Sequence, residues 1–142
     1  MTTKQIIGLE KEVKGADSLI RFLRDQGVDT IFGVTGGASL EMFDALGRIG
    51  REYEIRLIDT VKEDGAGYAA QGYARSTGKV GVGLTTSGPG ATNALTPLTD
   101  ASLDSIPIVL ISGQVRSEML GKGAFQEAPV TDMSRPITKK SY

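Results

Sequence analysis

The stretch KEDGAGYAAQGYARSTGKVGVGLTTSGPG, residues 62–90, joins a helix pattern, a strand pattern and a glycine turn in direct succession. Its first part, 62–77, predicts a helix. The inner face of this helix is unusually small, because four of its five residues are alanine: Ala66, Ala69, Ala70, Tyr73 and Ala74. Residues 79–85 (KVGVGLT) predict a buried strand, and TSGPG follows it. A helix, a strand and a glycine turn in this order are typical of an α/β domain.

The same alternation continues on both sides of this stretch. Further helices are predicted at 15–26, from Ser39 as the N-cap to about 46, and from about 91 to 103. Further strands are predicted at 30–34, 55–58 and 106–112, with nearly continuous apolar residues. Such strands favour a parallel sheet covered by helices on both faces. We therefore predict a doubly wound α/β domain over 15–142, preceded by a polar extension over 1–14.

The segment 113–142 contains one helical fragment at most by pattern and ends in the polar ITKKSY. A doubly wound sheet normally closes with a further helix and strand, so we expect the domain to be incomplete at its carboxyl end. An unclosed sheet exposes apolar surface that favours association. We therefore expect a partner chain, or a homo-oligomer.

Composition narrows the classes of function. The chain has 16 basic and 17 acidic residues without a basic stripe, which makes nucleic acid a poor candidate partner. No run of 18 apolar residues is present, and the amino terminus lacks signal- or transit-peptide features, so we expect no membrane span and a cytoplasmic location. The sequence contains no cysteine and no histidine, which excludes thiolate and imidazole metal sites and a Ser-His-Asp triad. Catalysis would therefore need a carboxylate, lysine, tyrosine, a cofactor or a partner chain.

Most of the glycine clusters follow predicted strands, where open α/β sheets bind ligands. TSGPG at 86–90 fits either a plain turn or a backbone cradle for phosphate, and TGGA at 35–38 has the same two interpretations. Glu63 begins a predicted helix at this edge. It either complements the helix dipole or is a carboxyl group in an apolar setting that exchanges a proton with a ring nitrogen.

Five segments taken together, in order, resemble one family: IFGVTGGA, KEDGAGYAAQGYARSTGKVGV, TTSGPGATNALTPLTDASLDSIPIVLISGQV, GAFQEAP and RPITKKSY. The chain resembles the amino-terminal, pyrimidine-binding domain of acetolactate synthase (acetohydroxyacid synthase) large subunits, which are thiamine-diphosphate enzymes. The resemblance covers about 15–142. It implies decarboxylation of a 2-oxo acid such as pyruvate and transfer of the two-carbon unit to a second 2-oxo acid, in branched-chain amino acid biosynthesis.

The resemblance also implies roles for single residues. Glu63 matches the glutamate that hydrogen-bonds N1′ of the aminopyrimidine and so promotes loss of the thiazolium C2 proton; the cofactor supplies its own base, which agrees with the absence of histidine. The other matching positions are Gly37 and Ala38 over the reaction centre, Val115, Phe125 and Gln126 in the substrate and cofactor pocket, Ser105 at an FAD contact, and Lys139 at the substrate channel. The alternative interpretations are a core position for Phe125, a turn position for Ser105 and a solvated tail for Lys139.

The sequence departs from the family in three places. Lys62 stands where histidine usually precedes the glutamate, and Arg116 follows GQV in place of a proline, so that the segment loses a fixed φ. The third departure is the absence of GDG, the start of the family motif that holds Mg²⁺ and the diphosphate in a chain about four times longer. We therefore expect no metal ligand here, Mg²⁺ and FAD only in the complete enzyme, and a diphosphate-binding domain or subunit as partner. Two alternatives stay open: a non-catalytic fragment or assembly module, and a phosphate binder that uses TSGPG.

Overall fold

The computed structural model describes residues 13–142, so most of the predicted extension 1–14 lies outside the described residues. Within them, four parallel strands form one sheet in the order β2-β1-β3-β4. Their bounds are β1 Thr30–Gly33, β2 Arg56–Asp59, β3 Gly81–Thr85 and β4 Ile108–Ser112.

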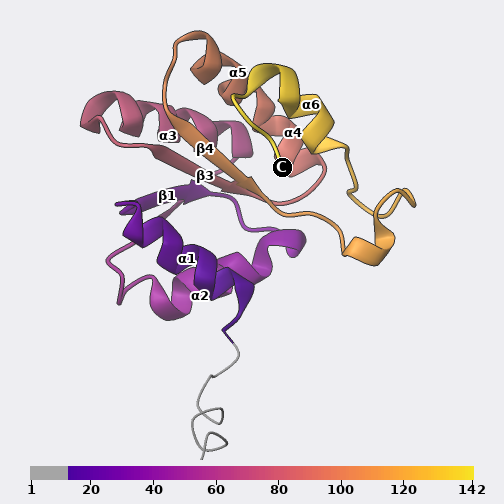
Figure 1. Cartoon of the computed structure of the whole chain (residues 1–142), viewed down its shortest axis with the longest axis horizontal. Coiled ribbons are helices and arrows are strands. Elements are labelled where there is room, and N and C mark those ends of the chain that lie inside the picture. The colour runs from indigo at the N-terminus through magenta and orange to yellow at the C-terminus, as the bar shows by residue number, and fades with distance from the viewer. Residues whose placement is uncertain (1–12) are drawn as a thin grey trace, which may run out of the picture.

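Helices cover both faces of this sheet (Figure 1). One face carries α1 (Gly15–Asp25) and α2 (Leu40–Ile49). The other carries α3 (Glu63–Thr77), α4 (Pro89–Asn93), α5 (Leu95–Leu103) and α6 (Val130–Ser134). Three 3₁₀ turns complete the described elements: η3 Gly37–Ser39, η4 Ser117–Met119 and η5 Arg135–Ile137. The predicted doubly wound α/β fold is confirmed.

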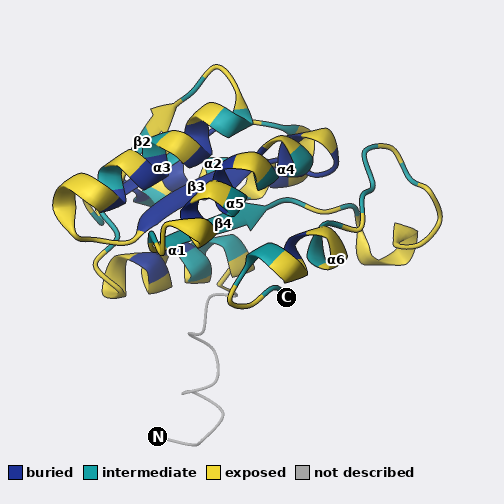
Figure 2. Ribbon diagram, turned by 90° about the horizontal axis from the view of Figure 1, so that it is seen from above, coloured by how far each residue is buried: buried dark blue, intermediate teal, exposed yellow. Residues whose placement is uncertain are grey.

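The core is centred on β3, whose five residues are all buried (Figure 2). On the face of α1 and α2, branched side chains from the helices pack with Val82 and Leu84 of β3. The buried members of this cluster are Ile20, Leu23, Ile31, Ala45, Leu46, Ile55, Val82 and Leu84. Burying these aliphatic groups supplies the main favourable free energy on this face.

On the opposite face, α3 approaches the sheet closely because neither surface carries bulk. Ala66, Ala70 and Ala74 are buried, as the small inner face of the predicted helix requires, whereas Ala69 is only half-buried. A Cβ at Gly81 of β3 would lie 2.6 Å from the carbonyl carbon of Ala70 and would overlap its oxygen. This close packing of α3 on β3 places the first residue of α3 at the carboxyl edge of the sheet.

Several predicted boundaries need correction. The helix predicted over 91–103 consists of α4 and α5, because Pro97 lacks an N–H and its ring clashes with a helical carbonyl four residues earlier, at Asn93, where α4 ends. β3 and β4 each begin two residues later than predicted. Ser39 is the N-cap residue of α2, as predicted, but its side chain does not cap the helix: the hydroxyl donates to the Gly36 carbonyl at 3.1 Å and accepts no helical N–H. The tail holds α6 and two 3₁₀ turns, more than the single fragment expected.

The outer edge of β4 is less covered than the strands inside the sheet. Val109 is 45% exposed and the other four residues of β4 are half-buried, in contrast to β3. A groove of about 1040 Å³ runs along this strand between α5 and the segment from α6 to Tyr142. Among the residues of β4, Val109 alone is therefore open to solvent. No helix in residues 13–142 is long and apolar enough to cross a membrane.

At the amino edge of the sheet, the carboxylate of Asp29 joins β1 to α3 and to the start of β3. It accepts hydrogen bonds from Lys79 Nζ at 2.6 Å, Tyr73 Oη at 2.6 Å and Thr30 Oγ1 at 2.8 Å. The bond from Lys79, followed by those from Tyr73 and Thr30, holds the pKa of Asp29 well below its usual range.

We expect Asp29 to make the stability of the chain sensitive to acid. Because its pKa is lowered in the folded state, its contribution is present above about pH 4, the unfolded value, and is lost as the pH falls toward the folded pKa. Asp29→Asn should lower the free energy of unfolding at pH 7 by up to about 1 kcal/mol, since the partly exposed ion pair is screened by solvent. Urea unfolding should show this deficit shrinking below pH 4. Asp100→Asn, on the exposed side of α5, is the control; an Asp29→Asn deficit that stayed constant with pH would contradict the assignment.

Candidate functional site

The segments that follow the four strands meet at the carboxyl edge of the sheet. Parallel strands end on the same side, so residues 34–39, 60–62, 86–90 and 113–129 are brought to one edge. Of the predicted site residues, Gly37, Ala38, Glu63, Val115, Phe125 and Gln126 lie in these segments or directly after them. The loop at 86–90, which follows the central strand β3, contacts the segments after β1 and β4 and the Glu63 side chain.

Thr86 connects this central loop to the segment after β1. The Ala38 N–H donates to Thr86 Oγ1 at 3.3 Å, and Thr86 is buried. A Cβ at Gly36 would lie 2.6 Å from the same Oγ1, so the two loops touch only because residue 36 is glycine. Gly37 and Ala38 are exposed beyond this contact, and a Cβ on Gly37 would meet nothing within 4 Å. The backbone at Gly37 therefore faces open space at the edge of the site.

Gln126 meets the central loop from the other side. Gly88 has a φ of +55°, and a Cβ there would lie 2.8 Å from the carbonyl carbon of Gln126. Gln126 itself has a φ of +58°, a conformation that costs a non-glycine residue about 1 kcal/mol or more. The surrounding loop therefore holds Gln126 in an unfavourable backbone conformation against the 86–90 turn.

Glu127 fixes the loop that carries Phe125 and Gln126. Its carboxylate accepts the N–H of Gly121 at 2.5 Å and of Ala124 at 3.0 Å. These backbone bonds, that of Gly121 first, lower the pKa of the Glu127 carboxyl group. Phe125, two residues before Glu127, is 88% exposed, so the interpretation of Phe125 as a core residue is wrong. The sequence alone does not mark Glu127 as a site residue, because the backbone N–H groups that it binds leave no signal in residue type.

Glu63 is the first residue of α3 and is half-buried. Its Oε2 accepts a hydrogen bond from Asn93 Nδ2 at 3.1 Å. Its Oε1 lies 3.3 Å from the position that a Cβ would take on Gly90. The carboxylate is thus seated against the backbone of α4 at Gly90 and bonded to the last residue of that helix. Asn93 is a second site residue that the sequence does not reveal, because no spacing rule connects positions 63 and 93.

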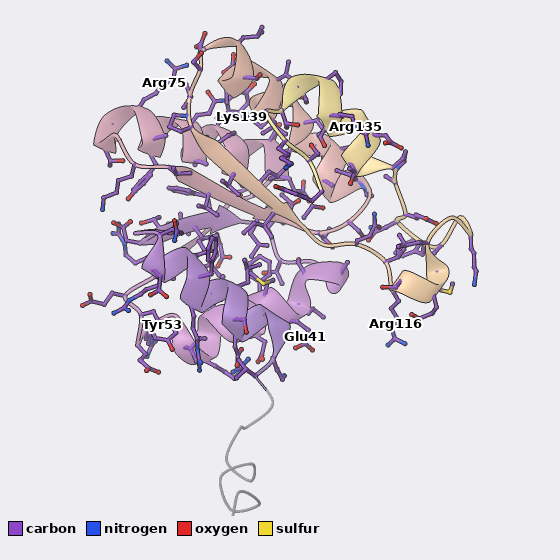
Figure 3. The ribbon with its side chains drawn as sticks, viewed as in Figure 1. Glu41, Tyr53, Arg75, Arg116, Arg135 and Lys139 are labelled. Atoms are coloured by element: carbon purple, nitrogen blue, oxygen red, sulfur yellow. The ribbon has the colours of Figure 1, made fainter. Side chains whose placement is uncertain are left out.

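Two predicted site residues lie elsewhere. Ser105 is exposed with a φ of +57°, and its N–H donates to the Ser102 carbonyl at 3.3 Å in the turn before β4, at the amino edge of the sheet. Lys139 is exposed in the tail beside β4 and α5 (Figure 3). Both line the groove along β4, and the structure does not bring either to Glu63. Val115 is half-buried, and its N–H donates to Gln114 Oε1 at 2.8 Å.

Lys62 and Arg116, the two residues near the site that differ from the family pattern, are both exposed. Lys62 Nζ lies 3.9 Å from Asp64 Oδ2, so its charge is balanced beside Glu63 by a neighbouring acid. Arg116, on the loop that extends from the domain in Figure 3, has a φ of −57°. That angle is the one that proline would impose, so the segment adopts the expected geometry although arginine does not lock it. Among the described residues, no group of acidic side chains is placed to hold a metal ion.

Comparison with known proteins identifies relatives of the chain. The family model described as "Thiamine pyrophosphate enzyme, N-terminal TPP binding domain" matches residues 13–134. The acetolactate synthase of Mycobacterium bovis is 48% identical over 132 residues, which are 93% of this chain and 21% of that protein. The chloroplastic acetolactate synthase of Arabidopsis thaliana is 50% identical over 129 residues, 91% of this chain and 19% of that protein. The large subunit from Haemophilus influenzae is 48% identical over 132 residues, 93% and 22% respectively. The chain thus spans about a fifth of the length of these curated relatives.

Proposed function

Because the chain belongs to the thiamine pyrophosphate enzyme family, through its N-terminal TPP-binding domain, we propose that it forms the pyrimidine-binding half of an acetolactate synthase-like active site. The observation that carries the proposal is the Glu63 carboxylate, which lies at the carboxyl edge of the sheet between Asn93 and Gly90. In this role Glu63 binds the N1′ atom of the aminopyrimidine and holds the proton there.

The residues around Glu63 fit the pyrimidine end of the cofactor. An aminopyrimidine is flat and needs a carboxyl partner beside a backbone surface without bulk, and Gly90 supplies that surface next to Oε1. Gly37 and Ala38, exposed at the same edge, would cover the ring, and Gln126 would line its other side. Thiamine diphosphate, when bound, supplies the electron sink for decarboxylation of a 2-oxo acid such as pyruvate and for joining the remaining carbons to a second 2-oxo acid.

We further propose that residues 15–142 act with a diphosphate-binding domain or subunit, in a homo-oligomer. The uncovered edge of β4 supports the need for further contacts, because unpaired strand edges favour pairing with other chains. Mg²⁺ and the diphosphate would be held by that partner. An FAD contact at Ser105 and a substrate contact of Phe125, Val115 or Lys139 belong to the same proposal and would depend on the assembled enzyme.

A complementation assay tests the proposal. The 142-residue chain alone, with thiamine diphosphate, Mg²⁺ and pyruvate, should form negligible acetolactate. Addition of a diphosphate-binding domain should raise the rate at least about 10²-fold, because the proton-transfer carboxylate and the cofactor then meet in one site. Robust turnover by the chain alone would contradict a divided site. Absence of turnover in both conditions, with the added domain shown to bind the chain, would favour a non-catalytic assembly module.

A further inference from the structure

We propose that Asn93 is a positioning residue for Glu63: its side-chain amide holds one carboxylate oxygen in place and leaves the other free for a ring nitrogen. The catalytic consequence of this inference rests on the proposed function of Glu63. The contact itself does not, because it is made between two side chains of this chain without a cofactor.

The contact is directional. An ionised carboxylate can only accept hydrogen bonds, so the Asn93 amide must present Nδ2, which donates to Glu63 Oε2 at 3.1 Å. The second oxygen, Oε1, faces Gly90 and makes no hydrogen bond to a side chain in the described part of the protein. One oxygen of the Glu63 carboxylate is therefore hydrogen-bonded to Asn93, and the other is available to a ligand.

The frame around the pair fixes the separation of the two residues. Asn93 ends α4, whose first turn is closed by the Thr92 N–H on the Gly88 carbonyl at 2.9 Å. Glu63 begins α3. This helix is bound to α5, the helix directly after α4, because Gln71 Nε2 donates to the Pro97 carbonyl at 2.6 Å. A Cβ on Gly67 of α3 would lie 2.7 Å from Pro97 Cβ, so the two helices are in direct contact. Because α5 directly follows α4, these contacts place the start of α3 close to the end of α4.

Positioning matters here because Glu63 lacks other restraints. It is half-buried at a helix start, and a free glutamate in such a place loses rotamer entropy when it is ordered. Lys62, the nearest cation in sequence, lies beside Asp64 and not beside Glu63 among the ion pairs of the described residues. Asn93 orders the carboxylate before a ligand arrives, as a preorganised acceptor requires.

The first test uses the chain as it exists, without cofactor. NMR measurement of the Glu63 side-chain couplings in a labelled 142-residue sample should show one dominant rotamer. Asn93→Ala should give averaged couplings with an unchanged fold by circular dichroism, while Thr96→Ala, exposed on α5, should leave the Glu63 rotamer as it is. Averaged couplings in the unmodified chain, or a single rotamer in Asn93→Ala, would overturn the inference.

The second test separates this inference from the proposed function. In the assembly with a diphosphate-binding domain, Asn93→Ala should slow exchange of the thiamine C2 proton about tenfold, as for loss of a partner that orients a reacting group. Thr96→Ala should not change the rate. A rate unchanged by Asn93→Ala but lowered by Glu63→Gln would overturn the positioning role alone. A rate unchanged by Glu63→Gln would overturn the proposed function, whatever the Glu63 rotamer.

Discussion

Glu63→Gln slows exchange of the thiamine C2 proton by about 10²-fold or more in the assembly with a diphosphate-binding domain, as expected for loss of a proton-transfer group. Glutamine keeps the length and shape of the side chain and can still accept the Asn93 bond through its amide oxygen. It has no negative charge to hold a proton on N1′ of the pyrimidine. A 10²-fold loss corresponds to about 2.7 kcal/mol of transition-state stabilisation. The rate is measured by quenched exchange in D₂O and NMR of the recovered cofactor.

Asp64→Asn is the matched control for this prediction. Asp64 also lies in the first turn of α3, but its Oδ1 accepts the N–H of Gly65 at 2.8 Å and its Oδ2 lies 3.9 Å from Lys62 Nζ, so its carboxylate is bound away from Asn93. If both acids only complemented the helix dipole, each substitution would cost under about 1 kcal/mol of stability and neither would change exchange. Equal exchange rates for the two variants would therefore show that the dipole interpretation of Glu63 is the correct one.

Most of the fold could be predicted from the sequence. Buried positions take apolar residues, and these recur with a spacing that differs between helices and strands. The break between α4 and α5 could be predicted as well, since Pro97 lies in the interior of the helix expected over 91–103, where proline breaks a helix. The predicted starts of β3 and β4 lie two residues too early because apolar character at Val80 and Ile106 extends beyond the hydrogen-bonded ladder, which begins where Gly81 pairs with Ile108.

The location of the site could also be predicted, since parallel strands end at one edge. Its internal contacts could not. Asn93 and Glu63 are 30 positions apart and carry no shared pattern. The contact between Gly88 and Gln126 depends on a positive φ at both residues, and nothing in the residue type glutamine predicts that angle. Ser105 and Lys139 came from family resemblance alone, and the structure places both on the groove beside β4.

Gly81→Ala should have the largest effect on stability, a loss of about 3 kcal/mol or more in the free energy of unfolding, at the upper end of overpacking costs. The new Cβ would lie 2.6 Å from the Ala70 carbonyl carbon and 3.0 Å from its Cα. These are backbone atoms, which cannot move aside by a rotamer change, so α3 must lift from β3. Urea unfolding followed by circular dichroism measures the loss.

Gly72→Ala, in α3 itself, is the control for the steric clash predicted for Gly81→Ala. Gly72 is exposed, and a Cβ there would meet nothing within 4 Å. Alanine should therefore stabilise α3 by up to about 1 kcal/mol through its higher helix propensity. The two substitutions add the same methyl group to a glycine, so opposite signs of the stability change isolate the contact between α3 and the sheet. A loss at Gly81 no larger than the change at Gly72 would mean that α3 is free to move on β3, and Glu63 would then lack the fixed seat on which its proposed chemistry depends.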